Sequence, residues 1–211
     1  MADPVNVGFY DMQSGEGVAN QRDEIVDVGL TPVSVSVLTP AVLATLKVLV
    51  IQNPLNDQYG AEYLAARADI AAAVANGLVV IIHDRHVVNA THLLGALEGI
   101  QFVRDPGAPG GAEMQLGSDG NLFAETQFGV VTDTSVDNYN SSNHGYALLS
   151  SLPDGALVFM TTNDPTHVTA FGVRSGAGMV IYTSAPVDFW GDAVNGESNP
   201  NFFGFDLTGM E

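Results

Sequence analysis

The segment ANGLVVIIHD, residues 75–84, decides the fold. Asn76 and Gly77 form a typical helix stop, and residues 78–82 follow as an unbroken run of large apolar side chains. A strand that is apolar on both sides needs cover on both faces, as a parallel strand between two layers of helices has. The segment therefore predicts a fold of the α/β class.

The chain before this segment alternates predicted strands and helices. Residues 61–76 form the clearest helix, which is rich in alanine, and its apolar stripe is expected at Leu64, Ala68, Ala71 and Ala72. Apolar runs predict strands at 5–12 and 48–51, and serine alternating with β-branched residues predicts an edge strand at 31–37. Shorter helices are expected at 22–28, closed by Gly29, and from Thr39-Pro40 to Leu46.

The chain after this segment becomes richer in strands. A short helix is expected at 89–99, capped by Asn89, then a strand at 100–103 and a glycine-rich loop at 105–121. Residues 156–162, 168–173 and 179–183 predict a meander that finishes the sheet, and the tail after Trp190 is expected to fold back over the core. We predict one domain over residues 1–211, a flavodoxin-like three-layer α/β sandwich with a mostly parallel sheet and a β-rich C-terminal part.

The charge of the chain limits its partners. It has 24 acidic residues against 6 basic ones, a net charge of −18 spread along the whole sequence. Such a field repels phosphate backbones and anionic lipid headgroups, so nucleic-acid and membrane-surface binding are disfavoured and cations are the more natural partners. The absence of cysteine excludes disulfides, thiolate metal sites and a cysteine nucleophile.

The compartment stays open between the cytoplasm and the exterior. The start, Met1-Ala2-Asp3-Pro4, lacks the basic and apolar regions of a signal peptide, and no apolar stretch approaches the roughly 20 residues that cross a bilayer. An acid-rich, lysine-poor composition also fits a protein of a salt-living or calcium-exposed bacterium. Export would then need another signal, or the sequence is part of a longer protein.

Polar residues that follow the predicted strands are the candidate site. Ligands of open parallel sheets bind outside the carboxyl ends of the strands, so we expect a small polar ligand or a cation there. The candidate ligand-binding residues are Asp11, Asn53, His83, Asp84, His86, Asn163 and Ser184, and His144 is expected to reach the same edge from a loop.

His83 and Asp84 are the pair with the most chemical potential. An imidazole beside a carboxylate can act as a general base with its orienting group, or the two can bind a divalent metal. The structural alternative is that His83 bonds the backbone while Asp84 caps the next turn. A cation remains the candidate cofactor, and Ser118-Asp119-Gly120-Asn121 resembles part of a calcium loop without its regular carboxylates. No glycine-rich segment has the pattern of a nucleotide site.

The order of the predicted elements resembles the class I glutamine amidotransferase-like fold, and in particular its ThuA-like branch. The resemblance covers roughly residues 5–190 and rests on the first strand at 5–11, the third at 48–54, the nucleophile-bearing strand at 77–84 and the last at 178–186. Amidotransferases have a cysteine after the fourth strand, a histidine after the last, and a glycine-rich oxyanion loop after the third. The corresponding residues here are His83-Asp84, Ala185-Pro186 and Asn53-Pro54-Leu55.

The resemblance with its missing groups implies that glutamine hydrolysis is not the activity, because this chemistry needs nucleophile, base and oxyanion donor together. The leading hypothesis is a non-catalytic binding or structural module, a part of a larger exported acidic bacterial protein. The alternative, which the resemblance implies, is a metal-dependent or carbohydrate-related ThuA-like enzyme that uses His83, Asp84 and His144 on a sugar-like ligand. A third hypothesis is that the acidity only keeps the domain soluble in high salt.

Overall fold

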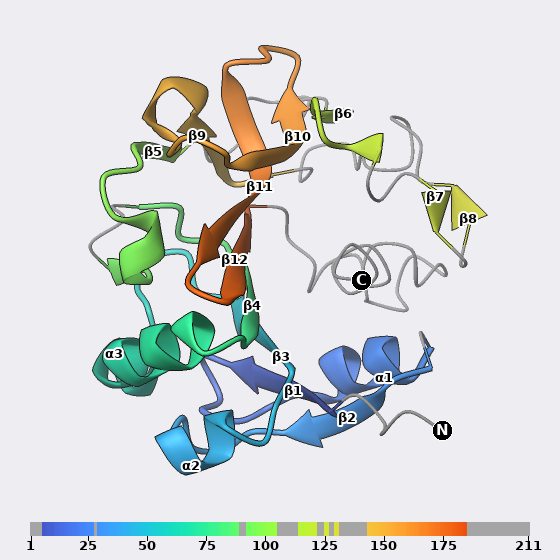
Figure 1. Ribbon diagram of the computed structural model, residues 1–211, viewed down its shortest axis with the longest axis vertical. Coiled ribbons are helices and arrows are strands. Elements are labelled where there is room, and N and C mark those ends of the chain that lie inside the picture. The colour runs from blue at the N-terminus through green and yellow to red at the C-terminus, as the bar shows by residue number, and fades with distance from the viewer. Residues whose placement is uncertain are drawn as a thin grey trace.

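A ten-stranded sheet forms the centre of the computed structural model (Figure 1). The structure describes residues 6–27, 29–88, 92–104, 114–121, 125–126, 129–130 and 143–184. The main path through the sheet is β2-β1-β3-β4-β12-β11-β10-β6, and β5 and β9 extend it because β5 pairs with β9 and β9 with β11. Every described strand but two therefore belongs to one sheet; the exceptions, β7 and β8, pair with each other.

The first half of the sheet is parallel, as predicted. Its strands are β2 (Thr31–Ser34), β1 (Asn6–Asp11), β3 (Val48–Asn53) and β4 (Val79–Asp84). All six residues of β3 are buried, which explains its uninterrupted apolar run. β2 lies at the edge, as its alternating pattern indicates, although it ends three residues earlier than expected.

The second half of the sheet is antiparallel and confirms the predicted meander. The strands β10 (Leu157–Thr162), β11 (His167–Ser175) and β12 (Gly178–Thr183) follow one another with tight turns. β12 then lies beside β4 in parallel register, so the last described strand occupies the middle of the sheet. The remaining strands are β5 (Phe102–Arg104), β6 (Met114–Leu116), β7 (Glu125–Thr126), β8 (Gly129–Val130) and β9 (Gly145–Leu148).

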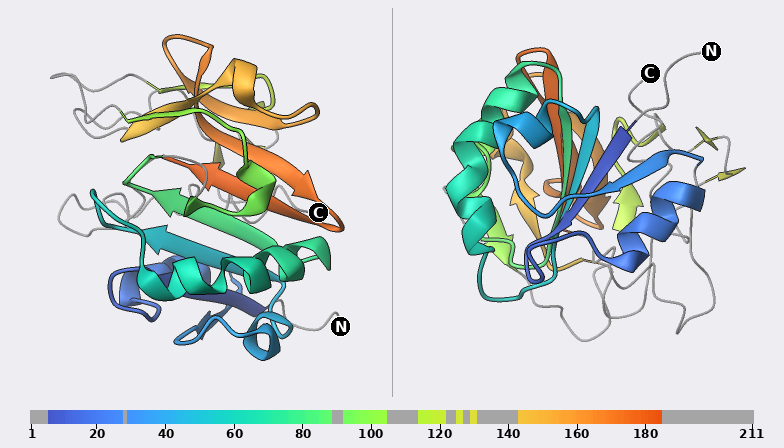
Figure 2. Two further views of the ribbon diagram at one scale, coloured as in Figure 1. Left: turned by 90° about the vertical axis from the view of Figure 1, so that its left-hand side faces the viewer. Right: turned by 90° about the horizontal axis from the view of Figure 1, so that it is seen from below.

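Helices on opposite faces of the sheet complete the three layers (Figure 2). α2 (Pro40–Leu43) and α3 (Ala61–Ala75) lie on one face, and α1 (Ala19–Asp27) lies on the other. The core divides accordingly: Tyr63 and Ile70 of α3 belong to one apolar cluster and Ile25 of α1 to a second one. The α/β sandwich is thus confirmed. No helix in the described part of the chain combines the length and the apolar character needed to cross a bilayer.

The buried face of α3 differs from the predicted stripe. Tyr63, Ala66, Ile70 and Val74 are buried, whereas Ala68 and Ala72 are exposed and Leu64 and Ala71 are half-buried. A helix with alanine on every side differs little in hydrophobicity between its faces, so the sequence pattern indicates the buried face only weakly. The large side chains Tyr63 and Ile70 decide which face packs against the sheet.

The predicted helix at 89–99 is wrong for its described part. Between residues 92 and 99 the longest helical element is the 3-10 turn η2 (Gly95–Leu97), and a second such turn, η4 (Leu149–Ser151), follows β9. Gly95 and Gly99 disfavour an α-helix, and Gly99 adopts a φ of 87°. Residues 89–91, most of the predicted 105–121 loop and the tail after Trp190 lie outside the described residues; the loop's described end includes β6.

Candidate functional site

The carboxyl ends of the parallel strands carry two rows of polar side chains, one on each face of the sheet. The register pairs Asp11 with Gln52, Gln52 with His83, and His83 with Thr183. It also pairs Asn53 with Asp84. Successive side chains of a strand point to opposite faces, so the first row shares the face of α1 and the second shares the face of α3.

This alternation separates His83 from Asp84. Ile81, two residues before His83, packs in the cluster of α1, and Ile82, two residues before Asp84, packs in the cluster of α3. The two neighbouring side chains therefore extend from opposite faces of β4. The expected pairing of His83 as base with Asp84 as its orienting group is not supported by this geometry.

Asp84 is fully buried and accepts hydrogen bonds from five donors of the protein. Tyr59 Oη and Tyr182 Oη donate to Oδ2 at 2.7 and 3.0 Å. Asn53 Nδ2 donates to Oδ1 at 3.0 Å. The backbone N–H groups of His86 and Val87 donate at 2.9 and 3.2 Å, so the predicted capping of the next turn by Asp84 is confirmed. A carboxylate engaged in this way is held in place, and its lone pairs are used inside the protein.

The two tyrosines beside Asp84 are neutral donors. Burial, followed by the charge of Asp84, raises the pKa of Tyr59 and that of Tyr182 well above the ordinary value. Both hydroxyl groups therefore keep their protons over the physiological range and can continue to donate to the carboxylate. The two hydroxyl groups thus hold the Asp84 side chain by hydrogen bonds.

Other predicted site residues also have structural partners. Asp11 Oδ1 accepts hydrogen bonds from the backbone N–H groups of Gln13 and Ser14, at 2.9 and 2.8 Å, and so caps the turn after β1. Asn163 lies exposed beyond β10 and accepts a bond from Gln115 Nε2. His86 is half-buried, with its Nδ1 3.0 Å from the carbonyl oxygen of Asn56.

Strands β5 and β9 lie across the end of the sheet, beyond β4 and β12. The backbone N–H of His144 donates to the carbonyl of Ser184, and Ser184 Oγ donates to the carbonyl of Gly145 at 2.6 Å. Arg104, at the end of β5, donates through Nη1 to the carbonyls of Arg85 and His86, both at 2.6 Å. Through these hydrogen bonds, β5 holds the loop after β4, and the start of β9 holds Ser184, the residue that follows β12.

His144 lies close to both arginines of this region. Its Nε2 is buried without a hydrogen-bond partner among the described residues. Burial, and then the charges of Arg85 and Arg104, lower the pKa of His144 to about 4. The imidazole is therefore neutral at pH 7.

The loop after β4 contains Val87, the one non-glycine residue with a positive φ in the described part of the chain. Val87 is fully buried and has a φ of 45°, which is a strained conformation for a β-branched residue. Gly145 packs against it: a Cβ on Gly145 would lie 2.8 Å from Val87 Cγ1. The described elbow thus falls three residues beyond Asp84, and its side chain is a valine that has no nucleophilic atom.

Metal binding by the predicted residues finds no support in the described part of the chain. There, no three histidine, aspartate or glutamate side chains come together as a metal-ligand group, so His83, Asp84 and His144 do not form one. Asp119, of the segment resembling a calcium loop, accepts the N–H of Val158 at 2.9 Å and so joins its turn to β10.

Sequence reasoning missed several residues of this region. Gln52 and Thr183 complete the row of His83, while Tyr59 and Tyr182 hold Asp84. The parallel register and the fold bring them together, and only Gln52, next to the predicted Asn53, had a signal in the sequence.

Comparison with known proteins identifies the fold. No family model matches the chain. No curated protein sequence matches it either. A solved protein of Thermoplasma acidophilum, assigned as part of a GMP synthase, is similar over 99% of this chain and 96% of its own, with 12% identity and a TM-score of 0.58. A glutamine amidotransferase of Methylobacillus flagellatus is similar over 99% and 95%, with 14% identity and a TM-score of 0.53.

A larger enzyme contains a similar part. The exo-β-1,4-mannosidase Op5Man5 of an Opitutaceae bacterium matches 98% of this chain with 12% identity and a TM-score of 0.55, but only 36% of its own length is covered. Identities this low establish the fold alone. The chain has the class I glutamine amidotransferase-like fold that the order of its elements indicated.

Proposed function

We propose that this chain is a non-catalytic amidotransferase-like module that binds or supports other molecules rather than transforming them. The observation that carries the proposal is the elbow after β4, where the strained residue is the buried Val87. Covalent catalysis at an elbow needs a nucleophile whose atom reaches the substrate. A valine covered by Gly145 cannot supply one.

The neighbouring polar groups support the same proposal. Asn53, where amidotransferases have their oxyanion loop, donates through Nδ2 to Asp84 and to the carbonyl of Gln58. Asp84 is engaged by five donors. These groups stabilise the folded chain, and using them on a substrate would break buried hydrogen bonds.

We further propose that the chain functions as a part of a larger, exported and acidic bacterial protein, and that it is related to the ThuA-like branch. The similarity to about a third of the mannosidase Op5Man5 supports the idea that this fold is used inside longer chains. The net charge of −18 fits exposure to salt or to cations.

Turnover assays test the proposal. The purified chain is incubated with glutamine and with an activated ester, beside a class I amidotransferase as positive control. We expect the release of ammonia from glutamine and of the alcohol from the ester to equal the blank. These rates should be the same in His83→Ala and His144→Ala. If His83→Ala does not fold, the same assay is made with the more conservative variant His83→Gln. Turnover that disappears in His83→Ala, or near-stoichiometric zinc, manganese or iron in the purified protein, would overturn it.

A further inference from the structure

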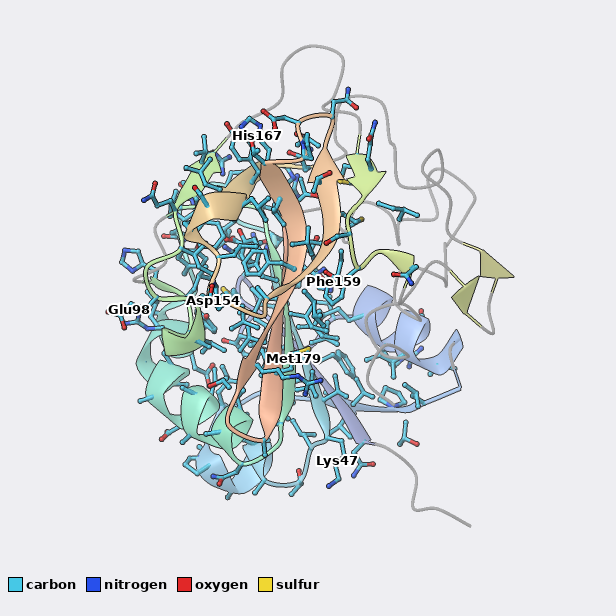
Figure 3. The ribbon with its side chains drawn as sticks, turned by 45° about the horizontal axis from the view of Figure 1, so that its top comes forward. Lys47, Glu98, Asp154, Phe159, His167 and Met179 are labelled. Carbon is cyan, nitrogen blue, oxygen red and sulfur yellow. The ribbon has the colours of Figure 1, made fainter. Side chains whose placement is uncertain are left out.

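An open pocket lies between α2 and α3, at the amino ends of β3 and β4. It is at the opposite end of the sheet from the polar rows: Lys47, which lines it, and His167, at the carboxyl edge, occupy opposite ends of the molecule in Figure 3. Its volume is about 330 Å³. Pockets for small ligands begin at about 300 Å³, so one small molecule can be accommodated.

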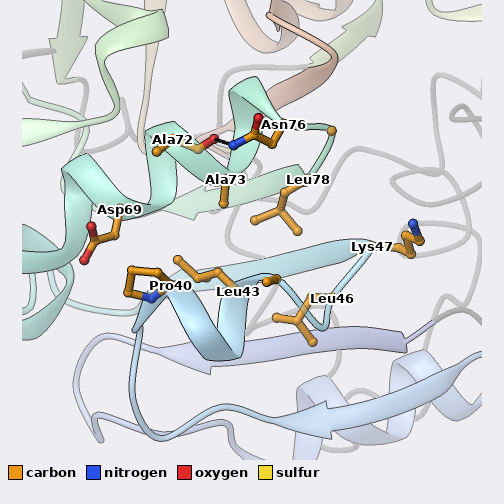
Figure 4. A pocket seen from close by; sticks show the side chains of 11 residues that line it. Pro40, Leu43, Leu46, Lys47, Asp69, Ala72, Ala73, Asn76 and Leu78 are labelled. Atoms are coloured by element: carbon orange, nitrogen blue, oxygen red, sulfur yellow. Dashed lines mark hydrogen bonds between the residues drawn. The ribbon is translucent and has the colours of Figure 1, made fainter.

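The floor of this pocket is apolar and its walls are low. Leu43, Leu46 and Leu78 are buried side chains of the core that reach the pocket (Figure 4). Ala44 and Ala72 line it as exposed residues. Pro40 is a third exposed apolar residue of the lining, whereas the leucines beneath are only 1–6% exposed. Covering the exposed proline and alanine side chains of this lining removes apolar surface from water, which favours binding.

Opposite charges stand at the two ends of the pocket. Lys47 lies at one end and Asp69 at the other (Figure 4). Both side chains are exposed, and within the described residues neither has an ion-pair or hydrogen-bond partner. Lys47 is also one of only 6 basic residues in a chain with 24 acidic ones. An unpaired ammonium is therefore an uncommon feature of this surface.

We propose that this pocket binds a small amphiphilic anion. Its aromatic or aliphatic body covers the exposed apolar lining, and its carboxylate or sulfonate faces Lys47 and avoids Asp69. The two charges thus set the orientation of the ligand, and the exposed apolar lining contributes affinity through the surface that the ligand covers. The proposal concerns a second site, and it holds whether or not the carboxyl edge of the sheet is catalytic.

Two fluorescent probes of the same shape test the role of charge. Anilinonaphthalene sulfonate carries one negative charge, and phenylnaphthylamine is its uncharged analogue. We expect Lys47→Gln to weaken the anionic probe about fivefold at low salt, the equivalent of about 1 kcal/mol, and to leave the neutral probe unchanged. Asp69→Asn should tighten binding of the anionic probe alone. If the two substitutions change the affinities of both probes equally, or change neither, the proposed orientation of the anion toward Lys47 is contradicted.

Filling the pocket tests its location. Ala72→Phe places a ring between the helices and should abolish binding of both probes. Ala68→Phe is the matched control, because Ala68 is an exposed alanine of the same helix that does not line the pocket. Circular dichroism and urea unfolding check that each variant is fully folded, since compact, partly folded chains also bind these probes. Equal probe affinity in the two variants would overturn the proposal.

Discussion

At the scale of single residues, Asp84 is the most constrained group of the candidate site. Its carboxylate lies at the end of β4, has no exposed surface and accepts from two tyrosines, one asparagine and two backbone N–H groups. Buried polar groups that lose their partners retain the cost of desolvation. Removing the Asp84 carboxylate would leave its five donors without this acceptor at the same time.

Asp84→Ala should therefore lower the free energy of unfolding by about 3 kcal/mol or more. Tyr182→Phe removes one donor and should cost about 1 kcal/mol. Urea unfolding measures both, and Asp154→Ala is the control because Asp154 is an exposed carboxylate. A loss for Asp84→Ala no larger than that of the control would contradict the network.

His144 makes stability depend on pH in a defined window. Its pKa is about 4 in the folded chain and 6.5 in the reference state, so between these values the unfolded chain binds more protons. Stability should then be retained above pH 6.5 and fall as the pH decreases toward 4. After allowance for solvent screening, the contribution is at most about 1 kcal/mol per pH unit.

Urea midpoints measured from pH 7 to pH 4 compare the natural chain with His144→Gln, which does not titrate. We expect the natural chain to lose stability relative to His144→Gln as the pH falls from 6.5 toward 4. Arg85 and Arg104 are the charged groups that act on this imidazole. Parallel curves would show that His144 is not held neutral.

At the scale of elements, the pair of strands β5 and β9 packs against the loop after β4 at the end of the sheet. Gly145 begins β9 with a φ of 148° and fits between β5 and the loop after β4. A Cβ there would lie 2.3 Å from the carbonyl oxygen of Val103 and 3.0 Å from Arg104 Cα. Backbone atoms on two sides leave no space for a side chain.

Gly145→Ala should consequently cost about 3 kcal/mol, because it combines backbone strain with a steric clash. Gly155→Ala is the matched control: Gly155 also has a positive φ, 79°, but a Cβ added to it would have no neighbouring atom within 4 Å, so the cost should be only about 1 kcal/mol. Thermal or urea unfolding gives both values. Similar losses would mean that β9 is not packed against the loop after β4.

At the scale of the whole molecule, charge dominates. A net charge of −18 on 211 residues produces repulsion that the fold must overcome. Salt screens this repulsion, and at about 1 M the screening length is only about 3 Å. The melting temperature should rise steadily with sodium chloride from about 0.05 M to about 1 M.

Calcium at matched ionic strength distinguishes screening from specific binding. Charge screening alone predicts that calcium chloride and sodium chloride at matched ionic strength raise the melting temperature equally. A much larger rise in melting temperature with millimolar calcium would contradict this and would identify a specific cation site.

Much of the fold could be predicted because it depends on local patterns. The apolar runs of β3 and β4, the helix stop at Asn76-Gly77 and the meander of β10 to β12 are all present where the sequence indicates them. The buried face of α3 was not predicted, since alanine gives the pattern no contrast. The helix expected at 89–99 failed in its described part, where two glycines interrupt it.

The polar residues at strand ends can be read from the amino-acid sequence, because strand boundaries follow from hydrophobic runs. Which of these residues meet depends on how the strands pair and pack. Register brings Asn53 to Asp84 and Gln52 to His83, while strand alternation turns the neighbours His83 and Asp84 to opposite faces. The pocket between α2 and α3 likewise exists only after the two helices pack. Such contacts join residues far apart in the chain, and no local pattern encodes them.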